Sequence, residues 1–165
     1  MDKIKFLEKI NKVFLVFIFS IYCFLIGYNN IIDYQSNFDF VRHVLLMDTT
    51  FPDNLHRARA ISSPFIHSLF FYTIILTELL ISVFTAIGGF KMFINIKNNT
   101  LQYNNAKLFA IIGLMLGIIL WFFFFIIIGG EWFVMWQSVQ WNGLMPARFM
   151  LIINLVLLIY VTKND

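Results

Sequence analysis

Four long apolar stretches divide the chain, and polar segments of different composition separate them. The apolar stretches run over residues 13–32, 64–94, 108–128 and 145–162. A helix rises about 1.5 Å per residue, so about 20 apolar residues cross the hydrocarbon core of a bilayer. Each stretch is close to this length or exceeds it. The pattern therefore predicts an all-α fold, a four-helix transmembrane bundle formed by a single domain over residues 1–165.

Two polar segments, 33–62 and 129–147, fall on the same side of such a bundle because two crossings separate them. Apolar residues in the first segment recur at helical spacing: Phe38, Val41 and Leu45. This spacing predicts a short helix on the membrane surface, with Asn37 as its N-cap. Pro52 ends it, because the residue before a proline avoids helical geometry. Residues 53–61 are expected to form a second short helix, and the two segments together form a cap.

Composition supports membrane insertion and excludes several soluble classes. The chain is 60% hydrophobic and 13% charged, with 21 Phe in 165 residues, whereas soluble domains carry about 25% charged residues. The one cysteine, Cys23, forms neither an intrachain disulfide nor a CxxC redox pair. No glycine-rich phosphate loop or basic stripe is present, so no nucleic-acid partner and no cofactor are predicted. The partner that the composition demands is the lipid bilayer.

Lysine and arginine are distributed unequally between the two sides of the predicted bundle. Eight lie with the termini and the middle turn: Lys3, Lys5, Lys9, Lys12, Lys91, Lys97, Lys107 and Lys163. Four lie with the cap: Arg42, Arg57, Arg59 and Arg148. Cytoplasmic loops carry the excess of positive charge. We therefore expect a multi-pass protein of the cytoplasmic (inner) membrane, with both termini in the cytoplasm and the cap on the outer face.

Glu78 lies near the middle of the second predicted span, where a carboxylate costs several kcal/mol. Small and polar residues share its helix face at spacings of three and four: Glu78, Ser82, Thr85 and Gly89. His67, eleven residues before Glu78, heads the same stripe. This face should point into protein. In the third span, Gly113 and Gly117 form a small-xxx-small pair that predicts close packing of spans two and three.

Two interpretations of Glu78 remain open at this point. It can be a buried structural carboxyl that hydrogen-bonds to Asn154 of the fourth span or to a hydroxyl. It can also be a proton-carrying or cation-binding site, together with His67 and Asn154, because intramembrane ionisable residues are commonly functional. The first interpretation gains from the absence of a second charge within the spans.

The cap contains the other candidate residues, which would serve an outer-face binding site. They are Arg42, His43, Asp48, Arg57, Arg59, Trp132, Trp136, Gln137, Trp141 and Asn142. The alternatives are a solvated, ion-paired loop for the charged residues and an aromatic belt at the membrane surface for the tryptophans. Metal or haem ligation is disfavoured because two of the three histidines lie in a loop. No spacing indicates a catalytic nucleophile, so we expect no catalytic residue and no metal site.

Two strings in the polar segments carry a resemblance to a known family. They are NFDFVRHVLLMDTTFP (37–52) and EWFVMWQSVQWNG (131–143), with RAISSPFIH (59–67) and Glu78 between them. The chain resembles a family of bacterial proteins described as predicted small integral membrane proteins of unknown function. The likeness covers nearly the whole chain and implies an inner-membrane protein of the layout given above. It implies no substrate, cofactor or catalytic residue.

The sequence therefore favours a non-enzymatic accessory or interaction protein of the cytoplasmic membrane, whose cap binds a partner or a lipid. A membrane-protein partner or a second copy of the chain would suit this role. The alternative is a small proton- or cation-coupled transporter that uses Glu78 as its coupling site.

Overall fold

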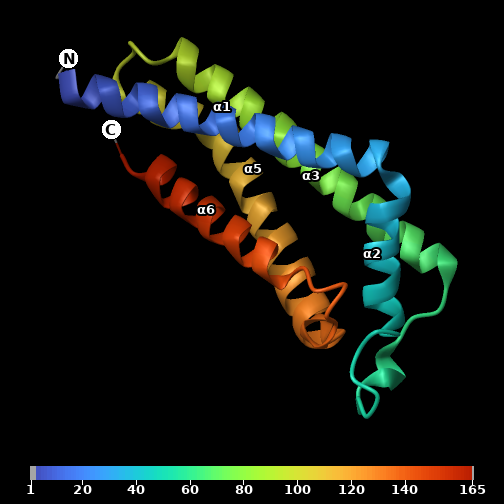
Figure 1. Cartoon of the computed structure of the whole chain (residues 1–165). Helices are drawn as coiled ribbons and strands as arrows, with labels where there is room; N and C mark the ends of the chain where they lie inside the picture. The colour runs from blue at the N-terminus through green and yellow to red at the C-terminus, as the bar shows by residue number, and fades with distance from the viewer. Residues whose placement is uncertain (1–2, 165) are drawn as a thin grey trace.

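The computed structural model describes residues 3–164, and these form a bundle of four long helices with no strand among them. The bundle consists of α1 (Lys3–Ile32), α3 (Pro64–Ile94), a third helical stretch over Thr100–Trp132, and α6 (Leu144–Thr162). All four are long and apolar enough to cross a membrane. Both termini lie at one end of the bundle (Figure 1). The predicted all-α four-helix architecture is confirmed.

Two of the four helices are longer than the apolar stretches. Helix α1 begins at Lys3 rather than at residue 13, because Lys9 and Lys12 are buried against other elements instead of forming a free tail. The ammonium group of Lys12 donates to the carbonyl of Lys163 at 2.8 Å. Residues 1, 2 and 165 lie outside the described part of the chain.

The third helical stretch is built from three pieces of different geometry. A short helix, α4 (Thr100–Ala106), begins where the side chain of Asn99 accepts from the amide of Gln102. Then α5 (Leu108–Ile118) continues into η2 (Ile119–Trp132), a π-helix. The wider turn of η2 shows in the hydrogen bond from the amide of Phe133 to the carbonyl of Ile128, five residues earlier. The stretch therefore extends past the predicted end at residue 128.

Helices α3 and α5 pack closely because small residues face each other, as the pattern of glycines predicted. A Cβ atom added to Gly88 would lie 2.2 Å from the amide nitrogen of Ala110. One added to Gly113 would lie 2.7 Å from a methyl group of Thr85. Gly117 differs from the prediction, because it packs against α6 and not α3. A Cβ atom added to Gly117 would lie 2.7 Å from the side-chain nitrogen of Asn154. The π-helical turn begins two residues later and follows this second close contact.

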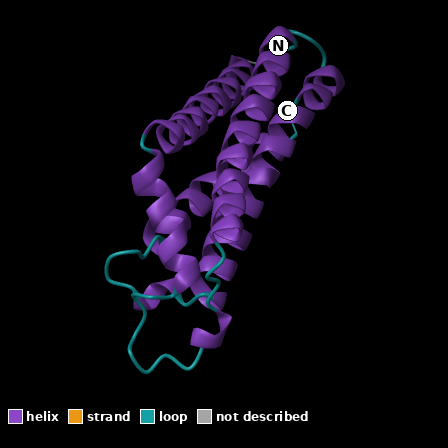
Figure 2. Ribbon diagram, turned by 90° about the vertical axis from the view of Figure 1, so that its right-hand side faces the viewer, coloured by secondary structure: helices purple, strands orange, loops and turns teal. Residues whose placement is uncertain are grey.

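The end opposite the termini carries the cap, which we define as residues 33–63 and 133–143. It contains α2 (Tyr34–Leu46), the 3-10 turn η1 (Arg57–Arg59) and the 3-10 turn η3 (Met135–Gln137). Loops connect these pieces (Figure 2). Helix α2 begins before Asn37, so the predicted N-cap is wrong: the Asn37 side chain donates to the carbonyl of Asp33. The second predicted helix, 53–61, is reduced to the single turn η1.

Candidate functional site

Glu78 lies in the cap half of α3 and is only 3% exposed. Its carboxylate accepts a 2.7 Å hydrogen bond from the side-chain amide of Asn30, near the end of α1. Gly27, one turn earlier in α1, allows this approach, because a Cβ atom there would meet Leu79 at 3.0 Å. The predicted pairing of Glu78 with Asn154 is wrong. Asn154 is fully buried elsewhere and donates to the carbonyl of Leu114 at 2.8 Å.

A pocket of about 340 Å³ lies beside Glu78, between the spans and the cap. We call it the cap pocket. Helices α1, α2, α3 and α6 contribute to its lining, together with η2 and Gly143. Its aromatic wall consists of Tyr22, Phe40, Phe71, Trp121 and Phe125, and its polar side chains are Asn30, Asn37 and Glu78. The arrangement is a hydrophobic chamber with a single carboxyl at one side.

A second, apolar hollow of about 300 Å³ lies between α1 and α6, and we call it the α1–α6 groove. Its lining consists of Leu15, Ile18, Phe19, Tyr22, Phe149, Ile153 and Leu157. Tyr22 lines both the groove and the cap pocket. Figure 1 shows α1 and α6 close together at their termini end and separating toward the cap. Tyr22 therefore lies between the groove and the chamber that contains Glu78.

The remaining residues of the predicted stripe on α3 are buried, as a face directed into protein requires. Ser20 of α1 donates to the carbonyl of Ser82 at 2.8 Å, so α1 also covers this part of the stripe. His67 lies far from Glu78 along α3 and contacts the carbonyl of Ile61 at 2.7 Å. The structure therefore does not bring His67, Glu78 and Asn154 into one site. Each of the three has its own partner.

The comparison with protein families matches residues 8–164 of the chain to one family model, "Predicted small integral membrane protein (DUF2165)". The chain belongs to this family. The match covers nearly the whole sequence, and the four apolar helices agree with its description as an integral membrane protein. Searches of curated proteins and of solved structures each found no match. The family description names no ligand and no activity.

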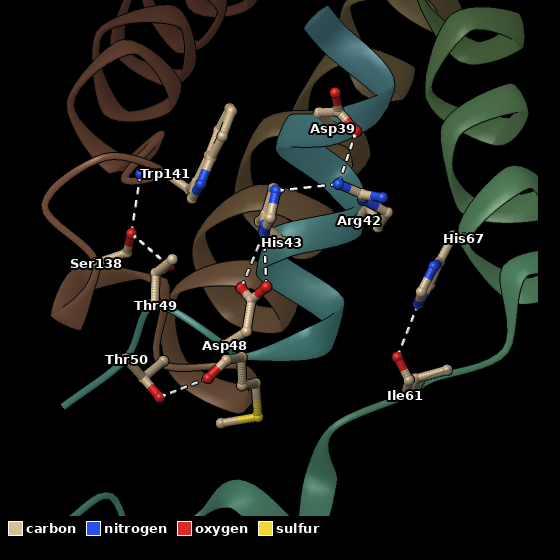
Figure 3. Close-up of polar contacts among 11 residues, drawn as sticks. Asp39, Arg42, His43, Asp48, Thr49, Thr50, Ile61, His67, Ser138 and Trp141 are labelled. Atoms are coloured by element: carbon tan, nitrogen blue, oxygen red, sulfur yellow. Dashed lines mark hydrogen bonds and ion pairs between the residues drawn. The ribbon is translucent and has the colours of Figure 1, made fainter. Parts of the chain in front are cut away.

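In the cap of this integral membrane protein, His43 connects three other side chains (Figure 3). Its Nδ1 lies 2.8 Å from a carboxylate oxygen of Asp48, and its Nε2 lies 3.3 Å from a guanidinium nitrogen of Arg42. Its ring stacks on Trp141, with centroids 4.8 Å apart. His43 and Asp48 are five residues apart, a spacing that does not bring side chains together on a regular helix. They meet because Met47 ends α2 in a left-handed conformation that turns the chain back. Arg42 also pairs with Asp39 at 3.1 Å.

Other candidate residues hold the cap segment 33–63 against the end of η2 and against the cap segment 133–143. Arg59 donates to the carbonyl of Trp132 at 3.1 Å and lies over the indole ring. The side chain of Gln137 accepts from the amide of Phe51. The side chains of Arg59 and Gln137, which the sequence suggested as candidates for ligand binding, therefore already have partners within the protein. The remaining candidates are more peripheral: Arg57 is exposed, Trp136 contacts Phe51 edge to face, and Asn142 accepts from the amide of Leu144.

Residues 3–164 contain no group of three or more His, Cys, Asp or Glu side chains placed to hold a metal ion. The histidines lie apart, and His43 and His67 already have hydrogen-bond partners. The cap pocket, which is lined by the buried carboxyl of Glu78, is therefore the candidate functional site. Sequence reasoning found Glu78 but missed Asn30, Tyr22 and Trp121. An amide two residues from a predicted helix end is an ordinary feature, and aromatic residues in a span resemble lipid-facing ones.

Proposed function

We propose that this protein is a lipid-binding accessory protein of the cytoplasmic membrane, which holds one amphipathic molecule in the cap pocket. The observation that carries the proposal is the position of Glu78. It is the single carboxyl of a chamber whose other lining is mainly aromatic and aliphatic, with the amides Asn30 and Asn37, and the apolar α1–α6 groove shares Tyr22 with that chamber. A polar head would contact Glu78 and Asn30, and an apolar tail would lie along the α1–α6 groove.

The energetic argument depends on the head rather than on the tail. A tail that moves from the bilayer into an apolar groove gains little, because lipid is as apolar as the groove. A hydrogen bond to a charged group contributes about 1.5–3 kcal/mol, and an unpaired buried carboxylate is costly. The affinity and the selectivity of the pocket should therefore come from contacts at Glu78.

The cap forms part of the chamber instead of acting only as an outer surface. Phe40 and Val41 of α2 line the pocket, as does Gly143 at the start of α6. A hydrogen bond of 2.8 Å between the hydroxyls of Thr49 and Ser138 joins the two cap segments behind them. Contacts within the cap would thus set the shape of the pocket, which supports a binding role for this end of the molecule.

Native mass spectrometry of the protein released from membranes in polymer nanodiscs tests the proposal. Ala147 lines the pocket and is 2% exposed, so Ala147→Phe should fill the pocket. Ile152 on the same helix is 60% exposed, so Ile152→Phe is the matched control. We expect wild type and Ile152→Phe to retain one amphipathic molecule that Ala147→Phe loses. Equal retention by all three proteins, or none in wild type, would remove the proposal.

We further propose that both termini face the cytoplasm, as the excess of lysine at their end of the bundle supports. Cysteine labelling in a Cys23→Ala background tests this. Lys97→Cys marks the turn at the termini end, and Val139→Cys marks the fully exposed tip of the cap. An impermeant maleimide added to intact cells should label the second and spare the first. The opposite pattern would invert the orientation.

A proton- or cation-coupled transporter is the second candidate, and one observation favours it. Below Glu78, the Ser20–Ser82 contact and Thr85 continue a polar stripe toward the termini end of α3. In proteoliposomes with an internal pH dye, this candidate predicts proton flux in wild type and none in Glu78→Gln. Equal flux in the two proteins, with Glu78→Gln correctly folded, would eliminate it.

A further inference from the structure

We infer that the cap pocket selects an organic cation: an amphipathic molecule with an ammonium head and a single apolar chain. This inference rests on the proposed function and adds the chemical class of the ligand. It is drawn from three features of the pocket, which are its single carboxyl, the aromatic side chains of its lining, and the apolar groove that shares Tyr22 with it.

The pocket contains one carboxyl, and no basic side chain of its lining pairs with that carboxyl. Glu78 is the one Asp, Glu, Lys, Arg or His among the described residues that line the pocket. Asn30 donates to one carboxylate oxygen, Oε2, at 2.7 Å. Within residues 3–164, the other oxygen, Oε1, has no hydrogen-bond partner. A buried carboxylate needs a partner of opposite charge, and a ligand ammonium can supply it.

The aromatic residues suit a cation with an apolar body. Trp121 is 4% exposed and packs edge to face on Phe19 with ring centroids 6.1 Å apart, which fixes the indole at the pocket wall. Phe40 and Phe125 lie on the same pocket and stack on each other. Tryptophan is the best aromatic partner of a cation, and aromatic side chains around a site are how proteins recognise alkylammonium groups.

Other ligand classes fit the pocket less well. Calcium, for example, takes six to eight oxygen ligands, and several of these are usually carboxylates. The pocket offers one carboxylate and two amide side chains, those of Asn30 and Asn37. A lipid phosphate would need arginine, lysine or a helix N-terminus. The first turn of α6 does line the pocket, through Gly143, Pro146 and Ala147. The described lining contains no basic side chain, however, and a phosphate would lie close to the Glu78 carboxyl.

The α1–α6 groove is the part of the site that would take an apolar chain. The α1–α6 groove is lined almost entirely by apolar side chains, and Tyr22 lies on both the groove and the cap pocket. The head would lie between Glu78 and Trp121, and the chain would pass Tyr22 into the groove. The ammonium can belong to a lipid of the membrane or to an amphipathic amine from outside. Mass spectrometry of the untreated protein distinguishes these sources, since a bound amine-bearing lipid would be retained.

Fluorescence quenching in nanodiscs of zwitterionic lipid tests the inference. Replacing Trp132, Trp136 and Trp141 by Phe leaves Trp121 as the only tryptophan. The probes are a decyldimethylammonium that carries a nitroxide at its head and the uncharged decanoyl ester of the same nitroxide. We expect the cation to quench Trp121 at a concentration at least tenfold lower than the neutral probe does.

Two glutamate variants localise that preference. Glu78→Gln should remove the tenfold preference and leave quenching by the neutral probe unchanged. Glu131→Gln removes a carboxylate outside the pocket and should retain the preference. If Glu78→Gln does not fold, the comparison of the two probes in the Glu78 protein decides the question alone.

The outcomes separate the inference from the proposed function. Equal quenching by the cationic and neutral probes would overturn the inference and leave a pocket for neutral lipids. Quenching by neither probe would overturn both. A cation preference that Glu78→Gln retains would also overturn the inference, because the charge that selects the cation would then lie elsewhere.

Discussion

Substitution of Gly88 by alanine should loosen the contact that holds α3 against α5. The added Cβ atom would lie 2.2 Å from the backbone nitrogen of Ala110 and 2.6 Å from its Cα. Ordinary van der Waals contact begins at 3.4 Å. No side-chain rotation relieves a clash with backbone, so the two helices must separate.

The cost follows from two opposing effects. Overpacking of a tight site costs about 3 kcal/mol when the neighbour cannot move, at the upper end of the usual range. Alanine in a helix regains about 1 kcal/mol relative to glycine. We therefore expect Gly88→Ala to lower the free energy of unfolding by about 2 kcal/mol, the difference between the two effects.

Gly129→Ala is the matched control, because its added Cβ would make only ordinary contacts, at 3.5 Å from both the end of the Met135 side chain and the carbonyl oxygen of Phe124. Reversible unfolding of both variants in mixed micelles with increasing SDS, followed by tryptophan fluorescence, gives the two free energies. Gly88→Ala should unfold at a clearly lower SDS fraction than Gly129→Ala. If the two variants unfold together, the close approach of α3 and α5 is not present in the protein.

Three further substitutions test contacts at the two ends of the bundle. Ser138→Ala removes the partner of Thr49 and of the Trp141 amide, so it should speed hydrogen exchange in the cap, whereas Ser68→Ala should not. Tyr103→Phe removes the buried hydrogen bond to the carbonyl of Lys9 and should cost about 1 kcal/mol in SDS unfolding; an unchanged midpoint would contradict this contact. For His43, Phe keeps the ring stack on Trp141 and Ala removes it, so Ala should lower the melting temperature of the cap more than Phe does.

The sequence was sufficient for the features that depend on long apolar runs and on helix periodicity. The span Pro64–Ile94 has the predicted bounds, and the face that carries Glu78 is buried. The close packing of α3 and α5 followed from small residues at spacings of three and four. These features are local in the chain, so composition and spacing are enough to predict them.

The features that form the cap pocket depend on contacts between distant segments. Asn30 and Glu78 are 48 residues apart, and nothing in either neighbourhood favours Asn30 over Asn154 as the partner. The π-helix η2 carries Trp121 and Phe125, and its apolar sequence gives no sign of the wider turn. The role of the histidines was also hidden, since His43 reaches Asp48 only through the left-handed residue Met47.

Photocrosslinking measures occupancy of the cap pocket most directly. A decylammonium with a diazirine at mid-chain is irradiated with the protein in nanodiscs, and the labelled peptides are mapped by mass spectrometry. The account predicts adducts that converge on the α1–α6 groove, around Ile18 and Ile153, in wild type and in Ile152→Phe, and their loss in Ala147→Phe. Adducts spread over exposed residues such as Leu76 of α3, with no difference among the three proteins, would contradict it.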